Sequence, residues 1–287
     1  MKLRTLAIAA LICASLGAAP ASADVPAKPR IWQGWPARVD SVPSMAAILV
    51  TQSGGPKRSF LCGGTVIAPR VVLTAAHCLQ GRRSRILANV SVMTGRTTLT
   101  PIHPGQPGQR SPIVDYATHE FFSKRRGYEN DIAVILLRDE TVAPPAAIDV
   151  SRSTFQSLTL DVAGWGRLGR RPVYPTSLQT AGLKVIPQSV CKRAYRGMPR
   201  PSLYVCAFGE NEGVCDGDSG GPLSLPEGTL VGLTSGGSVA CRLGGPAVFT
   251  RVGRYIDWMR ARIEQFAWEP GTPGSAIDEN LPGGPTD

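Results

Sequence analysis

The chain of 287 residues is long enough to bury a sizeable core in one large or two ordinary domains. Its 32 glycines and 25 prolines separate short apolar runs, which argues against a chain built from alternating strands and long helices. The formal charge of +10 comes from scattered Lys and Arg residues with only short clusters, which favours a solvated basic surface over one that binds acidic substrates, nucleic acid or anionic membranes.

Residues 1–23 have the pattern of a secretory signal peptide. Lys2 and Arg4 precede an apolar run of about 14 residues, which ends before the small-residue cleavage site Ala21-Ser22-Ala23. The run is too short to cross a membrane, and no later segment reaches the roughly 20 apolar residues that a spanning helix requires. We therefore expect a secreted protein, extracellular or, in a bacterium, periplasmic, with a mature charge of about +7.

Short runs of alternating or β-branched residues follow, and this pattern is typical of an all-β barrel or sandwich. The clearest runs are 45–51, 64–68, 71–74, 132–137, 183–186, 230–234 and 247–252. A Pro/Ala-rich passage within 140–149 divides them into two groups. Apolar residues at helical spacing predict one late helix over 253–265.

A histidine and an aspartate in the first group have the features of a catalytic pair. His77 stands in the run Thr74-Ala75-Ala76-His77-Cys78, and Asp131 directly precedes the apolar run 132–137. Histidine is the general base that a serine hydroxyl needs at neutral pH, and a buried carboxylate fixes its tautomer and stabilises the imidazolium. Taken singly, each is equally well explained as a core histidine or as an aspartate at the start of a strand.

The run Cys215-Asp216-Gly217-Asp218-Ser219-Gly220-Gly221-Pro222-Leu223 is the most informative segment of the chain. Glycines and acids around a serine favour a tight turn whose N–H groups point outward at a ligand. The amides of Gly217 and Ser219 are therefore candidates to hold a developing oxyanion. Unrelated hydrolases that use a serine, a histidine and an aspartate differ in the order of these residues along the chain. The order His77, Asp131, Ser219 is found in one of these classes.

These runs, together with Leu61-Cys62-Gly63-Gly64, Asn130-Asp131-Ile132, Ala163-Gly164-Trp165-Gly166 and Pro246-Ala247-Val248-Phe249-Thr250-Arg251-Val252, resemble the chymotrypsin-like (trypsin-fold) serine endopeptidases. The resemblance covers about residues 31–258. It implies two packed antiparallel β-barrels with a C-terminal helix, an N-terminal barrel over 31–145 and a C-terminal barrel and helix over 146–268. The Pro- and Gly-rich tail 269–287 lies beyond it and is expected to be disordered.

Six of the seven cysteines remain after the signal peptide, an even number that suits disulfides in an exported protein. Sequence alone leaves 15 connectivities open. The resemblance implies the pairs Cys62–Cys78, Cys191–Cys206 and Cys215–Cys241.

The resemblance also implies activation by cleavage between Arg30 and Ile31, at the end of a propeptide over 24–30. In this family the freed amine of the new first residue inserts and pairs with the aspartate before the serine, here Asp218. A buried carboxylate needs a cationic partner, and gaining one can order the oxyanion turn. Trp32 departs from the family pattern, which has a small aliphatic residue there.

The pocket that selects substrates follows from the same alignment of motifs. It places Gly213 and Val214 at the base and Gly237 and Ala247 on the walls. Ser235, counted with these substrate-binding residues, keeps the position that in relatives helps to hold the triad aspartate. Without a carboxylate at Gly213 a buried cation would lack a partner, so we expect cleavage after apolar residues of medium size. The run Ser235-Gly236-Gly237 lacks the family's usual tryptophan. Asp216 lies near the rim, where it would attract a basic side chain unless it is a solvated loop acid.

We expect no metal and no other cofactor, because no carboxylate lies between Cys78 and Asp115 to bind calcium and the cysteines lack metal-site spacing. The expected partners are protein or peptide substrates, an activating protease and protein inhibitors, with no nucleic acid and no membrane, and the expected state is a monomer. A catalytically silent homologue that only binds a partner, and an esterase with the same triad, are the alternatives. Asn89-Val90-Ser91 matches a glycosylation triplet.

Overall fold

The computed structural model describes residues 35–51, 58–151, 153–169, 173–195, 198, 200–237, 241 and 245–267. The predicted signal peptide, the activation segment with Arg30 and Ile31, and the tail 269–287 lie outside the described residues. Within the described residues, no helix combines the length and the apolar character needed to cross a membrane.

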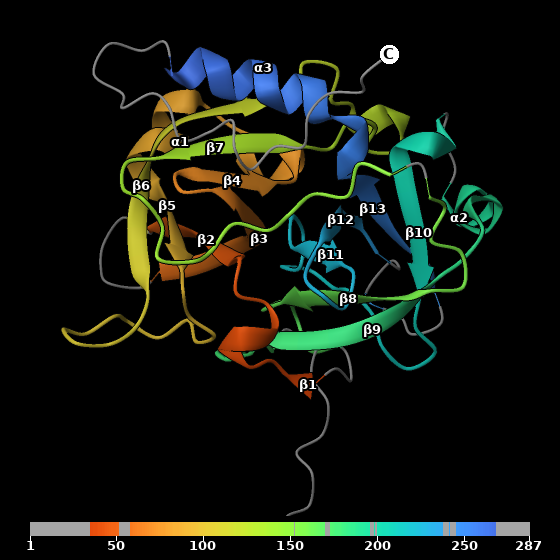
Figure 1. Cartoon of the computed structure of the whole chain (residues 1–287), viewed down its shortest axis with the longest axis horizontal. Coiled ribbons are helices and arrows are strands. Elements are labelled where there is room, and N and C mark those ends of the chain that lie inside the picture. Colours follow the sequence, from red (N-terminus) through yellow and green to blue (C-terminus); the bar gives the residue numbers. More distant parts are fainter. Residues whose placement is uncertain are drawn as a thin grey trace, which may run out of the picture.

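Six antiparallel strands of the N-terminal half close into a barrel. In space they follow the order β2-β3-β4-β7-β6-β5, at the left of Figure 1. Their bounds are β2 (Met45–Thr51), β3 (Arg58–Ala68), β4 (Val71–Thr74), β5 (Val90–Thr94), β6 (Gln109–Thr118) and β7 (Ala133–Leu137). A helix, α1 (Arg83–Asn89), connects β4 to β5 by way of the 3-10 turn η2 (Ala76–Leu79).

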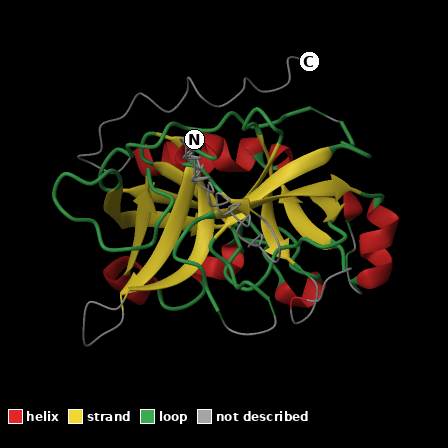
Figure 2. Ribbon diagram, turned by 90° about the horizontal axis from the view of Figure 1, so that it is seen from below, coloured by secondary structure: helices red, strands yellow, loops and turns green. Residues whose placement is uncertain are grey.

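A second ring of six strands forms the C-terminal half, in the order β9-β10-β13-β12-β11-β8 and closed by the pairing of β8 with β9. Their bounds are β8 (Thr159–Gly164), β9 (Gln179–Val185), β10 (Tyr204–Phe208), β11 (Pro222–Ser224), β12 (Leu230–Gly236) and β13 (Ala247–Arg251). The short β1 (Trp35–Pro36) adds to β9. In Figure 2 the strands form two groups side by side.

Alternate side chains of β7 pack on opposite faces of the strand, against two different apolar clusters. All five of its residues are buried, because both faces of the strand are covered. Ala133, Ile135 and Leu137 face the barrel interior, whereas Val134 and Leu136 belong to a second cluster with Met259 and Ile263 of the C-terminal helix. This helix, α3 (Ile256–Ala267), lies across the top of Figure 1.

A separate apolar cluster joins the two barrels. Met45, Ala47 and Leu49 of β2 pack with Trp165 and Leu178 of the second barrel. The Trp165 side chain is fully buried, and its indole N–H donates to the carbonyl of Thr97 at 3.0 Å. The barrels are thereby fixed to each other, so that residues from both can be held in one site. The prediction of two packed antiparallel barrels and a C-terminal helix is confirmed.

Three disulfides staple loops to this framework: Cys62–Cys78, Cys191–Cys206 and Cys215–Cys241. These are the pairs that the family resemblance implies. The first joins β3 to η2, and the second joins the helix α2 (Gln188–Ala194) to β10. The third links the turn that carries Ser219 to the segment before β13.

Candidate active site

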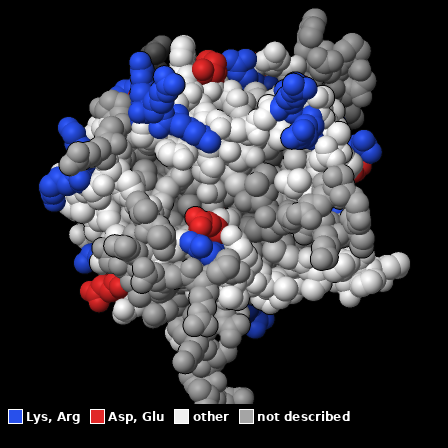
Figure 3. Space-filling view, turned by 180° about the vertical axis from the view of Figure 1, so that it is seen from behind, with Lys and Arg blue, Asp and Glu red and all other residues white. Residues whose placement is uncertain are grey.

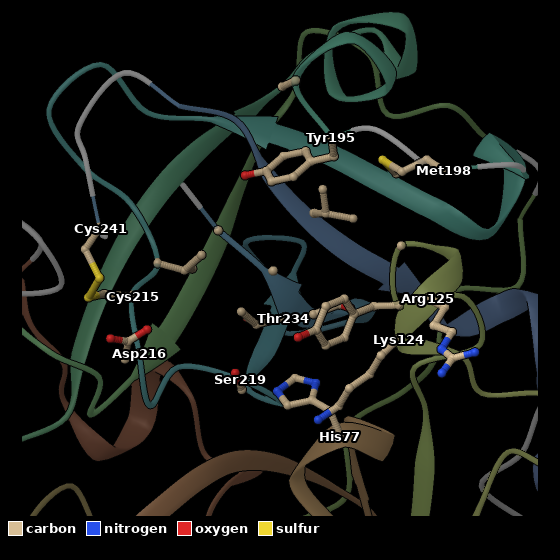
Figure 4. Close-up of a pocket in the computed structure, with 18 residues that line it drawn as sticks. His77, Lys124, Arg125, Tyr195, Met198, Cys215, Asp216, Ser219, Thr234 and Cys241 are labelled. Atoms are coloured by element: carbon tan, nitrogen blue, oxygen red, sulfur yellow. A yellow bond between two sulfur atoms is a disulfide. The ribbon is translucent and has the colours of Figure 1, made fainter. Parts of the chain in front are cut away.

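A cavity of about 660 Å³ is lined by His77 and Ser219, which come from different barrels. In Figure 4 their side chains lie next to each other at the floor of this cavity. The structure therefore brings together two residues that are 142 positions apart in the chain. Sites built between two rigid domains in this way commonly bind substrates.

The imidazole of His77 is held by a carboxylate that has no contact with solvent. Nδ1 of His77 lies 2.7 Å from Oδ2 of Asp131, and the backbone N–H of His77 donates to Oδ1 at 2.9 Å. Asp131 is 0% exposed. A buried carboxylate favours the tautomer that carries its proton on Nδ1, which leaves Nε2 as the acceptor.

Two hydroxyl groups of the second barrel hold Asp131 in place. The Ser235 hydroxyl donates to Oδ2 of Asp131 at 2.6 Å, and the Thr250 hydroxyl donates to its backbone carbonyl at 2.9 Å. Ser235 therefore makes the contact with the aspartate that the family resemblance implies for it. The buried carboxylate is therefore hydrogen-bonded on both of its oxygens, as a buried polar group needs to be.

The turn that carries Ser219 is fixed by its own backbone. The N–H groups of Asp218 and Gly221 donate to the carbonyls of Cys215 and Asp218, each at 3.0 Å. Gly217 has φ 98°, a left-handed conformation that glycine adopts without strain. The carbonyl of Ser219 accepts from the N–H of Gly63 in β3 at 2.8 Å, which ties the turn to the first barrel.

The amides of Gly217 and Ser219 are available to a ligand, since neither donates a hydrogen bond to another residue that the structure describes. They belong to the same turn as the Ser219 hydroxyl. Two unused N–H donors in a partly enclosed site suit a developing negative charge.

Asp218 lies in the core beneath this turn, with 1% of its surface exposed. Burial raises the pKa of Asp218 to about 7, although its oxygens accept from the N–H groups of Gly166 and Cys215, both at 2.8 Å, which lowers it. Gly166 has to be glycine because an added Cβ would lie 2.3 Å from Cγ of Asp218. The carboxyl group is thus buried among described residues without a cation.

The predicted pocket residues divide into two groups. Val214, Ser235 and Gly237 line the cavity, but Gly213 and Ala247 are not among the residues that line it. Ala247 is instead part of the apolar core of the second barrel, and a Cβ added at Gly213 would meet no atom within 4 Å. The cavity wall also includes Tyr195, Met198, Thr234 and Val248, which sequence reasoning missed.

Asp216 at the rim has a partner of its own. Its carboxylate lies 2.9 Å from the guanidinium of Arg167, whose side chain is 16% exposed whereas that of Asp216 is 67% exposed. The expectation that Asp216 attracts basic substrate residues therefore needs correction, because its charge is already compensated. Sequence reasoning missed Arg167, which stands 49 positions earlier in the chain.

Two clusters within the described part of the chain contain three potential metal ligands each: Cys62, His77 and Cys78, and Cys215, Asp216 and Cys241. Both include the two sulfurs of a disulfide. Metal ions bind thiolates, so neither cluster offers a suitable donor set.

Comparison with known proteins agrees with this geometry. The sequence model of the Trypsin family matches residues 31–259. Human kallikrein-8 is 31% identical over 72% of this chain and 78% of its own length. Trypsin of Saccharopolyspora erythraea is 34% identical over 72% of this chain and 89% of its own length, and human kallikrein-14 is 35% identical over 76% and 79%. The chain therefore belongs to the trypsin family of chymotrypsin-like serine endopeptidases.

Proposed function

We propose that this enzyme is exported as an inactive precursor and that, once activated, it cleaves proteins after apolar residues of medium size, with Ser219, His77 and Asp131 as the catalytic triad. The observation that carries the proposal is the chain of contacts from Ser235 through Asp131 to His77, which ends in the cavity that Ser219 also lines. Hydrolysis by a serine nucleophile needs a carboxylate that orients an imidazole and an imidazole that takes the proton of the serine.

In this mechanism the Ser219 oxygen attacks the carbonyl carbon of the scissile bond while His77 takes the hydroxyl proton. The N–H groups of Gly217 and Ser219 bind the oxyanion of the tetrahedral intermediate. His77 then gives its proton to the leaving amine, the C–N bond breaks, and an acyl group remains on Ser219. Water, deprotonated by His77, releases the acyl group and restores the hydroxyl. Asp131 stays ionised and stabilises the imidazolium.

The apolar preference rests on the walls of the cavity. Val214, Val248 and Met198 contribute apolar side chains, and the only described carboxylate on the lining, Asp216, is paired with Arg167. A buried Lys or Arg of the substrate would lose hydration without gaining a partner, whereas an apolar side chain gains about 1.5–3 kcal/mol on burial. Gly237 keeps the wall open, since an added Cβ would lie 3.0 Å from the Val214 carbonyl.

Activation by cleavage after Arg30 is supported by the state of Asp218. Its carboxyl group is buried, and no cation of the described part of the chain pairs with it, so a newly formed amine at Ile31 would supply the missing positive charge. Export is supported by the pattern of residues 1–23 and by the three disulfides. We further propose that the activating protease and protein inhibitors are the main protein partners besides substrates.

The test is a cleavage profile of the protein after it has been cut behind Arg30. We expect peptides with Leu, Met, Val or Phe before the scissile bond to be hydrolysed, Lys and Arg peptides to be poor substrates, and Ser219→Ala to abolish all turnover. Faster cleavage after Lys or Arg would contradict the assigned specificity. No cleavage of any peptide would favour a silent homologue, and hydrolysis of esters alone would favour an esterase.

A further inference from the structure

Two cations of the first barrel line the same cavity as His77 and Ser219. Lys124 and Arg125 belong to the 3-10 turn η3 (Lys124–Arg126), and both are exposed. Figure 4 shows their side chains beside His77, on the side away from Asp216 and the Cys215–Cys241 disulfide. In Figure 3, Lys and Arg side chains gather along the upper part of the face, where few acidic side chains lie.

The charges of these two residues are not compensated within the described part of the chain. Neither Lys124 nor Arg125 forms an ion pair or a side-chain hydrogen bond with a residue that the structure describes. The acid on the opposite wall, Asp216, is already bound to Arg167 at 2.9 Å. The described residues that line the cleft beside His77 therefore contribute a net positive charge, which attracts acidic groups.

The loop that carries the cations is firmly attached to the rest of the molecule. The N–H of Ser123 donates to the carbonyl of Glu129 at 3.0 Å and closes the loop at its base. The carboxylate of Glu129 is buried and forms an ion pair with Arg200 of the second barrel. Because the loop is held from both barrels, little ordering is needed before its cations meet a ligand.

The same loop also packs directly against the catalytic imidazole. The Tyr128 ring meets the His77 ring edge-on, with 5.5 Å between their centroids. Tyr128 has φ 61°, a conformation that is unusual for a residue other than glycine. Tyr128, Lys124 and Arg125 all line the cavity, so we expect a bound substrate to lie close to this loop.

We propose that Lys124 and Arg125 are specificity residues that select acidic side chains in the part of the substrate before the scissile bond. The proposal rests on the proteolytic function above and narrows its substrate class to peptides with an apolar residue in the pocket and Asp or Glu one to three positions upstream. The upstream side is part of the proposal: both cations line the cavity that also holds Val214 and Gly237, which we assign to the side chain before the scissile bond.

The size of the effect is limited by solvent. Ion pairs between exposed side chains contribute modestly and are screened by salt, so two such contacts correspond to about a two- to tenfold preference for Glu over Gln. The preference should shrink as the ionic strength rises from about 0.05 M to about 1 M, whereas an apolar contact in the pocket would not weaken.

The experiment uses peptide p-nitroanilides that end in Leu and carry Glu, Gln or Lys at each of the three preceding positions. They are assayed with the activated protein and with Arg125→Glu, Lys124→Glu/Arg125→Glu and Arg126→Glu. Arg126→Glu is the matched control, because Arg126 is exposed on the same turn but is not part of the cavity lining. Fluorophosphonate labelling of Ser219 shows that each variant is folded and active.

We expect Glu peptides to have the highest kcat/KM with the wild type, Arg125→Glu to reduce this preference, and the double variant to prefer Lys. Arg126→Glu should change the ratio of Glu to Gln turnover less than twofold. Equal ratios in the wild type and the double variant, with all proteins labelled and cleaving the Gln peptide, would overturn the proposal and leave the proteolytic function intact. A preference for Glu only after the scissile bond, measured with internally quenched peptides, would overturn it too. Failure of every protein to cleave or to label would instead contradict the proposed function.

Discussion

At the residue scale, the site depends on how the Asp131 carboxylate is held. Oδ2 of Asp131 accepts from the Ser235 hydroxyl at 2.6 Å and lies 2.7 Å from Nδ1 of His77. Oδ1 accepts from the backbone N–H of His77 at 2.9 Å. The two bonds to His77 fix both the position and the rotation of the ring. The hydrogen bond from Ser235 fixes the carboxylate against the second barrel, so a substitution at Ser235 should alter the orientation of the His77 ring.

We therefore predict that Ser235→Ala lowers kcat. A hydrogen bond to a charged group contributes about 1.5–3 kcal/mol, so the expected loss is about 10- to 100-fold, accompanied by a lower melting temperature. Thr65→Val is the control, because the Thr65 hydroxyl is buried and has no hydrogen-bond partner among the described residues. Steady-state kinetics and thermal unfolding of both variants check the prediction, and an unchanged kcat in Ser235→Ala would show that Asp131 does not need this donor.

The sequence identifies His77, Asp131 and Ser219 because each stands in a distinctive run, and the structure brings His77 and Asp131 into contact and places Ser219 on the same cavity. The sequence could not reveal the ion pair between Asp216 and Arg167. That contact depends on how two loops fold over each other, and no local spacing records it. The position of Lys124 and Arg125 on the cleft was missed for the same reason, since their run reads as an ordinary solvated cluster.

At the scale of elements, local pattern predicts the strands that are buried on both faces. The expected runs 45–51 and 71–74 coincide with β2 and β4. A short run of apolar residues bounded by turn residues is typical of a buried strand. The predicted run 183–186 covers only the end of β9 (Gln179–Val185), whose first two residues, Gln179 and Thr180, are polar. The ends of such a strand are set by its pairing with β8 and β1. A single sequence does not show which strands pair.

Helices show the same division. The expected helix over 253–265 corresponds to α3 (Ile256–Ala267), preceded by the 3-10 turn η6 (Val252–Arg254). Its apolar face packs on the first barrel, so the periodicity is strong. By contrast, α1 and α2 have seven residues each and bury only Ile86 and Cys191. Helices this short owe their existence to the tertiary framework, which here includes the Cys191–Cys206 disulfide, and leave little periodic signal.

At the scale of the whole molecule, the two barrels are each a scaffold for half of the site. His77 and Asp131 come from the first barrel, and Ser219 and Ser235 come from the second. The cluster around Trp165 and the bond from Gly63 to the Ser219 carbonyl connect the halves. The sequence predicts this arrangement through family resemblance, whereas the angle and separation of the barrels follow from packing that only the structure shows.

The buried carboxyl of Asp218 predicts how the stability of the uncleaved chain depends on pH. Its pKa is raised to about 7 in the folded protein, so between about pH 4 and pH 7 the folded state binds more protons than the unfolded state. The free energy of unfolding should therefore fall as the pH rises through this range, by at most about 4 kcal/mol from this group. Asp218→Asn should have a flatter profile, because it removes the titrating group.

Urea unfolding of the uncleaved wild type and of Asp218→Asn between pH 4 and pH 8 measures this difference. Comparing slopes cancels the titration of all other groups. After cleavage behind Arg30, pairing with a new amine would keep Asp218 ionised, and the difference in slope between the wild type and Asp218→Asn in this range should then disappear. Parallel profiles of the two uncleaved proteins would show that Asp218 is charged already and does not await a cation.

The central claim is that His77, oriented by Asp131, activates Ser219, and the rate of fluorophosphonate attack on the cleaved protein tests it most directly. Mass spectrometry should locate the adduct on Ser219 alone. Asp131→Asn, which turns the imidazole to the wrong tautomer, should slow the reaction at neutral pH by about 10³- to 10⁴-fold. Modification of Ser219 at the same rate in wild type and Asp131→Asn, or no faster than that of an ordinary surface serine, would contradict the account.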